Sequence, residues 1–229
     1  MTDLNSNFVD LERAQQYIDK GPPAFTPGHA GLMQMIGVLL GETMPGNGTV
    51  LIVGAGGGLE TRYLAAVEPK WRFVGVDPAA PMLALARVTA SNAGDRLTLI
   101  EGTITAAPDG PFDAATCILV LGLVPDDGAK LELLRQTRRR LKRGAPFVLV
   151  DQCLDRSAAD FDQRLDRYAA YARRSRVDGD VIAGARAGVA GLESMVPAQR
   201  NEALLSEAGF DGIELFYVGM AWRGWLSYA

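Results

Sequence analysis

The sequence predicts an α/β fold with a doubly wound, seven-stranded and mostly parallel sheet, and three observations support this prediction. Short apolar runs alternate with helical patterns between residues 49 and 151, as in consecutive strand–helix–strand units. The first of these runs ends in a glycine-rich turn, Gly54-Ala55-Gly56-Gly57-Gly58. The last two strand patterns have no helix between them, so they must pair as an antiparallel hairpin.

The first predicted strand covers residues 49–53, a β-branched and apolar run typical of a strand that is buried on both faces. Gly54, Gly56 and Gly58 follow it, and glycine at a strand-to-helix turn lets the backbone take positive φ and come close to a ligand. The helix after the turn, ending near Val67, directs its N-terminal amides at the same place. The turn therefore indicates a nucleotide-type cofactor site, with a plain tight turn as the alternative.

Two glycine fingerprints compete for this turn. The dinucleotide pattern G-x-G-x-x-G requires a third glycine where the chain has Leu59, whereas the shorter G-x-G-x-G is met. No G-x-x-x-x-G-K-[ST] follows, which excludes a triphosphate P-loop. The second strand, residues 71–77, ends at Asp77, at the spacing where a carboxylate accepts hydrogen bonds from ribose hydroxyls. The alternative role for Asp77 is an N-cap of the next helix.

The remaining elements follow in chain order. We expect a helix from Pro78 through Val88, strands at 97–100 and 112–120, a helix from 127 to 141 that stops at Gly144, a strand at 146–151, a helix at 158–174, an Ala/Gly-rich segment at 181–191, a helix at 197–208, and strands at 212–218 and 220–227. An insertion after the fifth strand lies at the carboxyl edge of a parallel sheet, where ligands bind. We therefore expect residues 152–196 to cap the substrate within a single domain, residues 1–229.

Residues ahead of the first strand are predicted to form a lid, residues 1–45, over the glycine turn. A loose helical pattern covers residues 8–20, and a second helix is expected through Leu32–Leu40. Between them, three prolines and two glycines in residues 21–29 predict the absence of regular structure.

Composition narrows the function classes. A content of 48% hydrophobic and 22% charged residues is ordinary for a soluble globular protein. The net charge of −4 gives no electrostatic footprint for nucleic acid, and the basic run 138–143 is interpreted as a solvated helix C-terminus. Cys117 and Cys153 are expected to be buried thiols, and with a single histidine no metal site is predicted. No signal peptide or membrane-length apolar run is evident, so a cytoplasmic protein without a membrane partner is expected.

These features together resemble the class I S-adenosylmethionine-dependent methyltransferases over residues 45–229. The residues that carry the resemblance are 50–58 as the first motif, Asp77 as the ribose acid, Phe112-Asp113 at the opening of the fourth strand, 140–145 as an R-x-L-K-P-G-G-like turn and 207–210 as E-A-G-F. The resemblance implies S-adenosyl-L-methionine as the cofactor. It implies as cofactor-binding residues His29, Gly54, Ala55, Gly56, Asp77, Pro78, Met82, Gly102, Thr103, Ile104 and Ile118. It assigns no catalytic residue.

Two positions depart from the family pattern. Ile52 stands where the family often has an acid, so a carboxylate near the methionine moiety is missing. Thr103 stands where an Asp often follows the glycine of the third strand, so the adenine amino group would be bonded only through the hydroxyl or the backbone. Adenine can also pack against Ile104 and Pro78.

The predicted lid is similar to that of the carboxy-S-adenosylmethionine synthase branch, with Pro27-Gly28-His29 in place of a proline-glycine-tyrosine segment. That branch has an arginine for the extra carboxylate where this chain has Leu204, so ordinary S-adenosylmethionine is expected. The resemblance predicts that His29 faces the methionine end of the cofactor as a neutral imidazole. The alternative is that His29 has a structural role or is merely exposed to solvent.

The apolar segment Leu121-Gly122-Leu123-Val124 follows the fourth strand, where enzymes acting on amino groups of bases carry N-P-P-[YF]. With the acidic chain, this favours a small, partly apolar methyl acceptor over nucleic acid. Three alternatives stay open: a related enzyme that acts on tRNA or modifies S-adenosylmethionine itself, a nicotinamide-dependent oxidoreductase, and a non-catalytic S-adenosylmethionine-binding protein. Leu59 and the lack of a Tyr-x-x-x-Lys pair disfavour the oxidoreductase. A homodimer is compatible with the sequence.

Overall fold

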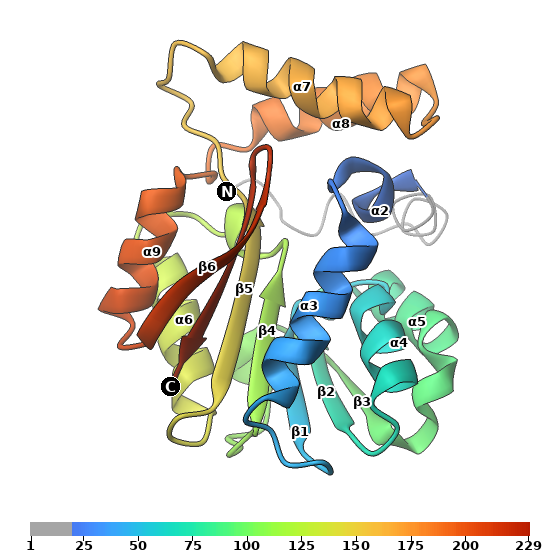
Figure 1. Cartoon of the computed structure of the whole chain (residues 1–229), viewed down its shortest axis with the longest axis vertical. Coiled ribbons are helices and arrows are strands. Elements are labelled where there is room, and N and C mark those ends of the chain that lie inside the picture. Colours follow the sequence, from blue (N-terminus) through green and yellow to red (C-terminus); the bar gives the residue numbers. More distant parts are fainter. Residues whose placement is uncertain (1–19) are drawn as a thin grey trace.

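A seven-stranded sheet in the order β3-β2-β1-β4-β5-β7-β6 separates two layers of helices (Figure 1). The structure is a computed structural model and describes residues 20–229, so the helix predicted at residues 8–20 lies, apart from Lys20, outside the described residues. The strands are β1 (Thr49–Val53), β2 (Arg72–Asp77), β3 (Leu97–Glu101), β4 (Ala114–Ile118), β5 (Pro146–Gln152), β6 (Asp211–Gly219) and β7 (Trp222–Tyr228). β1 to β5 are parallel, and β6 and β7 form the predicted antiparallel hairpin. The predicted fold class is confirmed.

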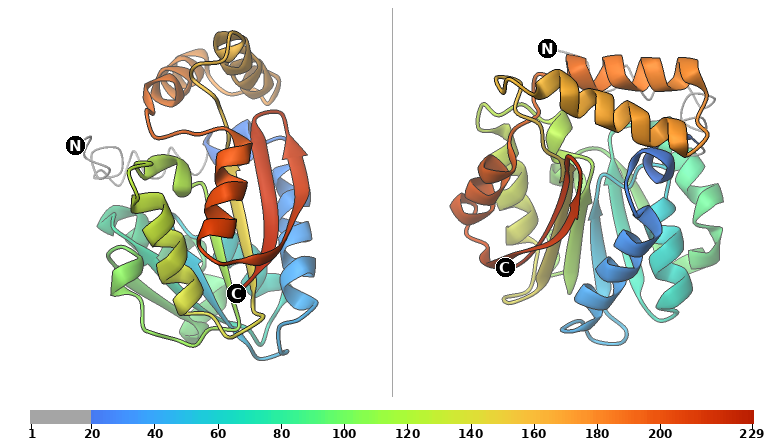
Figure 2. Two further views of the ribbon diagram at one scale, coloured as in Figure 1. Left: turned by 90° about the vertical axis from the view of Figure 1, so that its left-hand side faces the viewer. Right: turned by 45° about the horizontal axis from the view of Figure 1, so that its top comes forward.

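Both faces of the central strands are covered, which explains their continuous apolar sequence. Along β1, Val50 and Ile52 point to one half of the core, and Leu51 and Val53 point to the other. The helices α3 (His29–Gly41), α4 (Leu59–Val67) and α5 (Ala80–Thr89) cover the first face, and α6 (Ala129–Arg139) and α9 (Ala198–Glu207) cover the second (Figures 1 and 2). Short 3₁₀ turns connect them at η1 (Ser91–Arg96), η2 (Ile104–Ala106) and η3 (Leu121–Leu123).

The fourth strand is shorter than the predicted 112–120. It ends at Ile118 because the next residue, Leu119, has a φ of 62°, which no strand conformation allows. The backbone N–H of Leu119 still donates to the carbonyl of Val150 in β5 at 2.8 Å. The chain therefore turns sharply away from the sheet at the edge where β1 also gives way to its glycine turn.

The prediction that residues 21–29 lack regular structure was wrong. Residues Pro22–Phe25 form a short helix, α2, with proline in its first positions, where the missing N–H has no intrahelical partner to lose. Phe25 is buried and stacks on Tyr168 with ring centroids 4.8 Å apart. His29 was expected in this loop and is instead the first residue of α3, after Gly28 with a φ of 67°.

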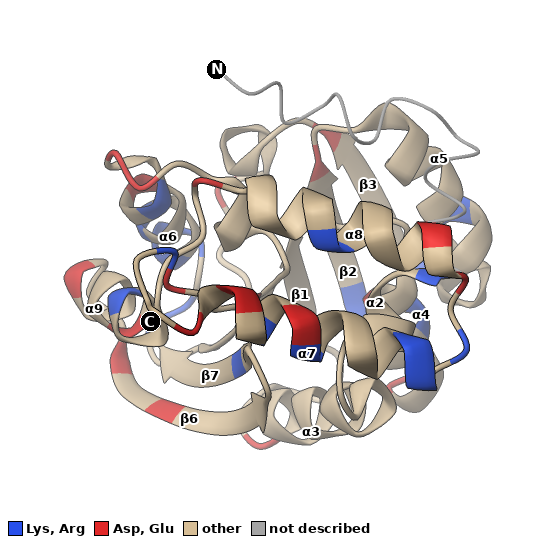
Figure 3. Cartoon of the chain, turned by 90° about the horizontal axis from the view of Figure 1, so that it is seen from above, with Lys and Arg blue, Asp and Glu red and all other residues tan. Residues whose placement is uncertain are grey.

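The inserted segment forms α7 (Phe161–Arg174) and α8 (Gly179–Gly191), which lie side by side across the carboxyl ends of the strands (Figures 2 and 3). Arg186 of α8 ties the pair together through an ion pair with Asp166 of α7 at 2.8 Å. α7 also packs against α2. Among the described helices, none is long and apolar enough to cross a membrane.

Candidate functional site

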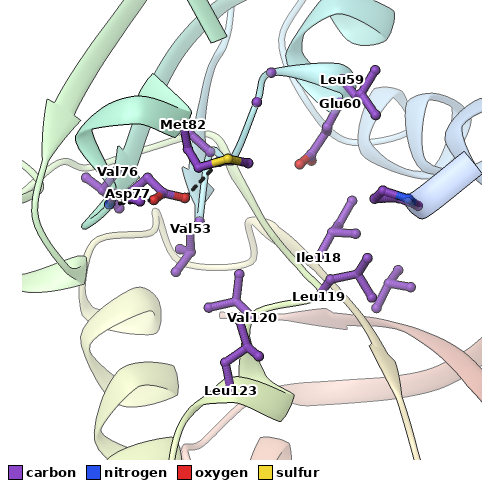
Figure 4. A pocket seen from close by; sticks show the side chains of 18 of the residues that line it. Val53, Leu59, Glu60, Val76, Asp77, Met82, Ile118, Leu119, Val120 and Leu123 are labelled. Atoms are coloured by element: carbon purple, nitrogen blue, oxygen red, sulfur yellow. Dashed lines mark hydrogen bonds between the residues drawn. The ribbon is translucent and has the colours of Figure 1, made fainter. Parts of the chain in front are cut away.

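A pocket lies at the carboxyl edge of the sheet, between the ends of β1, β2 and β4 and the helices α2 and α3 (Figure 4). All the residues predicted to bind the cofactor line it: His29, Gly54, Ala55, Gly56, Asp77, Pro78, Met82, Gly102, Thr103, Ile104 and Ile118. All but His29 come from the carboxyl ends of β1, β2, β3 and β4 and the segments that follow them, which the parallel topology brings to one edge; His29 comes from the start of α3. Their binding of the cofactor stays a prediction.

The backbone of the glycine turn has a conformation that residues other than glycine rarely adopt. Gly54, Gly56 and Gly58 have φ values of 77°, 49° and 83°. A Cβ on Gly58 would lie 2.9 Å from the Cα of Ala86 in α5, and one on Gly54 would lie 2.1 Å from Cγ2 of Val120. The turn is therefore pressed between α5 and the loop after β4, with its backbone facing the pocket.

Asp77 is held by this turn and by its own helix. Its Oδ2 accepts from the backbone N–H of Gly56 at 2.8 Å, and its Oδ1 accepts from that of Ala79 at 2.9 Å. Ala79, not Asp77, is the N-cap residue of α5. Burial raises the pKa of Asp77 and these two hydrogen bonds oppose the rise. Each carboxylate oxygen keeps a further lone pair, so the group can also accept from a ribose hydroxyl.

The opposite end of the pocket is formed by α2, α3 and the end of β4. His29 is half buried there, and this burial lowers the pKa of its imidazole, which is therefore neutral at pH 7. Five residues that sequence reasoning missed complete this end: Thr26, Leu32, Met33, Leu123 and Trp222. No local pattern marks them, because strands and helices that are distant in sequence bring them together.

Glu60 is a second functional candidate that sequence reasoning missed. It is the second residue of α4, and Figure 4 shows its carboxyl group pointing into the pocket between Met82 and Ile118. Its Oε1 is buried and has no hydrogen-bond partner among the described residues. Burial raises the pKa of Glu60 to about 7, and the nearby Thr116 hydroxyl offsets part of this rise. A charged residue two positions after the last glycine of the turn was the available signal.

A buried polar group supports the loop after β4. Asp151, at the end of β5, accepts from the backbone N–H of Gly122 at 2.5 Å, and Nζ of Lys130 donates to the carbonyl of Leu121. Burial raises the pKa of Asp151 to about 6 and lowers that of Lys130. The side chain of Ser194, which precedes α9, donates to the carbonyl of Gly122 at 2.5 Å. These contacts fix η3, whose Leu123 lines the pocket.

The cysteines take no part in the pocket. Cys117 and Cys153 are both buried and free, as expected, and burial raises the pKa of each thiol above its ordinary range. Within residues 20–229, no group of three or more His, Cys, Asp or Glu side chains is placed to hold a metal ion.

Sequence and structure comparisons both find similarity to known methyltransferases. Residues 50–144 match the family model of a methyltransferase domain. A curated protein from Aspergillus luteorubrus, named "Probable methyltransferase ltbC", is 29% identical over 172 residues, which are 71% of this chain and 56% of that protein. The chain thus spans little more than half the length of that relative.

Two solved structures share the fold at low identity. A SAM-dependent methyltransferase from Aquifex aeolicus has a TM-score of 0.64 at 16% identity, covering 96% of this chain and 98% of its own. Human N-acetylserotonin methyltransferase in complex with SAM has a TM-score of 0.60 at 15% identity, covering 99% of this chain and 59% of its own. Residues 50–144 thus resemble a methyltransferase domain in sequence, and the strand order and the glycine turn of the chain agree with the class I S-adenosylmethionine-dependent methyltransferase fold.

Proposed function

We propose that the protein transfers the methyl group of S-adenosylmethionine to a small-molecule acceptor. The observation that carries this proposal is the continuity of the pocket. It runs from Asp77 and the glycine turn at one end to an apolar end under α2 and α3. Two ligands can therefore meet inside one pocket, which in-line transfer requires.

The cofactor end fits S-adenosylmethionine in its own geometry. The positive φ values of Gly54, Gly56 and Gly58 leave backbone, not side chains, facing the ligand. Asp77 offers free lone pairs to ribose hydroxyls, and Ile104 and Pro78 offer apolar contact to a base. When bound, S-adenosylmethionine supplies a methyl group already activated on a sulfonium. The protein therefore needs chiefly to align the acceptor and to exclude water.

The acceptor end favours a partly apolar molecule. Its walls include Leu32, Met33 and Trp222, and none of the described residues that line the pocket is a lysine or an arginine. A phosphodiester would find no cation there, which argues against a nucleic-acid acceptor. The sequence-based expectations of a cytoplasmic location and of a homodimer stay predictions.

Calorimetry of the purified protein with S-adenosylmethionine and with NAD tests the first half of this proposal. We expect saturable binding of S-adenosylmethionine and none of NAD. Transfer of a labelled methyl group to a panel of small phenols, amines and carboxylates tests the second half. Binding of NAD alone would contradict the methyltransferase assignment, and cofactor binding without transfer to any small molecule would favour a non-catalytic binding protein.

A further inference from the structure

The pocket contains a buried carboxyl group, and no lysine or arginine among the described residues lines the pocket beside it. Among the described lining residues, the carboxyl groups are those of Glu60 and Asp77, and His29 is neutral at pH 7. Both oxygens of Asp77 already accept backbone N–H groups. Oε1 of Glu60, by contrast, is buried and unpaired. A buried carboxylate with only a nearby hydroxyl and no cation is costly, so the ligand-free protein holds this group near its point of protonation.

The position of the Glu60 carboxyl group relative to the sheet indicates which part of a ligand it would contact. It lies beside Thr116 of β4, and Thr116 pairs in register with Ile52 of β1. Ile52 is the apolar residue at the position where related enzymes often carry an acid near the methionine moiety. The carboxyl group therefore reaches the seam between β1 and β4 from the start of α4, where the strand itself has none.

Resting on the proposed function, we propose that Glu60 binds the α-ammonium group of S-adenosylmethionine, in place of the acid that Ile52 lacks. Asp77 and Glu60 would then receive opposite ends of one ligand: the ribose hydroxyls at the end of β2 and the amino group at the β1–β4 seam. The ammonium group supplies both the missing positive charge and a hydrogen-bond donor to Oε1.

Binding of three ligands distinguishes a contact with the amino group from other roles of Glu60. The ligands are S-adenosylhomocysteine, its decarboxylated form, which keeps the amine, and 5′-methylthioadenosine, which lacks the amino-acid part. Calorimetry at pH 8 compares the wild type with Glu60→Gln and with Glu68→Gln, a control at the far end of α4. In Glu60→Gln, the Kd of both amine-bearing ligands should rise by about tenfold or more, the scale of a hydrogen bond between charged groups. The Kd of 5′-methylthioadenosine, and all three constants in Glu68→Gln, should stay within about twofold.

The pH dependence supplies an independent readout. Because the free protein must lose a proton from Glu60 before pairing, S-adenosylhomocysteine should bind the wild type more weakly below pH 7, by about tenfold per unit. This dependence should be absent in Glu60→Gln. The other titratable groups around the seam are His29, Asp77, the Cys117 thiol and, next to that thiol, Asp151 and Lys130. All of them are present in both proteins, so the difference between the two profiles isolates Glu60.

Several outcomes would overturn the inference. An equal loss for all three ligands would make Glu60 a determinant of pocket shape only. An unchanged Kd for S-adenosylhomocysteine, together with a collapsed rate of methyl transfer, would make Glu60 a general base. Thermal melting of each variant shows that it is folded. If the wild type binds none of the three ligands, the proposed function itself fails, which is distinct from failure of the Glu60 assignment.

Discussion

The pocket has a floor and a roof that are held in different ways. The floor consists of the turns after β1 to β4, residues 54–58, 77–79, 102–104 and 118–120. The roof has an inner layer, α2 and the first turn of α3, which lines the pocket, and an outer layer, α7 and α8, which contributes no lining residue. Floor contacts join backbone groups of neighbouring strands, such as the N–H groups of Gly54 and Ala55 that donate to the carbonyl of Val76 at 2.9 Å.

Roof contacts join segments that are far apart in sequence. The indole N–H of Trp222 donates to the carbonyl of Phe25 at 3.2 Å, and the Tyr217 hydroxyl donates to the carbonyl of Pro27. The stack of Phe25 on Tyr168 adds the inserted helix to the same group. Backbone hydrogen bonds of the sheet therefore hold the floor, whereas a few side-chain contacts attach the roof to the rest of the protein. We therefore expect the floor to tolerate almost no change and the roof to move without destroying the cofactor site.

The largest contrast should come from adding one methyl group to each region. Gly58→Ala places a Cβ at positive φ and 2.9 Å from the backbone of α5, and should lower the free energy of unfolding by about 2–4 kcal/mol. Gly188→Ala, in the last turn of α8 with open space around the new Cβ, should raise it by about 0.4–1 kcal/mol. Urea unfolding of both variants measures the difference. Equal effects of the two substitutions would remove the distinction between floor and roof.

Tyr168→Leu should loosen the roof selectively. Losing an aromatic stack costs on the order of 0.5–1.5 kcal/mol beyond the lost area, so the amides of Ala24, Phe25 and Thr26 should exchange faster with solvent. The Kd of S-adenosylhomocysteine should stay within about twofold of the wild type, since no residue of α7 lines the pocket. For any acceptor that is turned over, KM should rise. A collapse of cofactor affinity would show that α7 serves the cofactor instead.

His29→Phe should have the smallest effect. Loss of a neutral hydrogen bond to the cofactor carboxylate would raise the Kd of S-adenosylhomocysteine by about threefold, with kcat preserved. Loss of a general base would instead lower kcat and spare the Kd, and the wild-type activity would fall only below a pKa lowered from 6.5 by burial. If both constants are unchanged, His29 is a bystander and its predicted role in cofactor binding is wrong.

The floor could be predicted from the sequence because each of its parts is local. A glycine turn, an acid that ends a strand and a proline that opens a helix are patterns within a few residues, and parallel pairing then forces Gly54, Asp77 and Gly102 to one edge. The exception is the end of β4, where positive φ at Leu119 closes the strand early, in a conformation that leucine rarely adopts.

The roof could be predicted only in outline. The first helix of the insertion was expected, whereas residues 181–191 were expected only as an Ala/Gly-rich segment and form most of α8. The helix α2 was missed because three prolines outweighed the tolerance of a helix start for proline. Trp222 and Thr26 carry no local sign of lining a pocket, since they reach it through contacts across nearly the whole chain. Glu60 was missed for another reason: its charge suits a helix N-terminus, and only the structure shows that it points inward.

Calorimetric titration of S-adenosylhomocysteine into the wild type and Asp77→Ala tests the central claim most directly, with Asp211→Ala at the exposed start of β6 as the control. Asp77 is expected to join the floor to the ligand, because its carboxyl group accepts from the N–H of Gly56 and keeps lone pairs free for ribose hydroxyls. We predict saturable binding to the wild type and to the control, and a loss of roughly 1.5–3 kcal/mol of binding free energy in folded Asp77→Ala. Unchanged affinity in that variant would contradict the account.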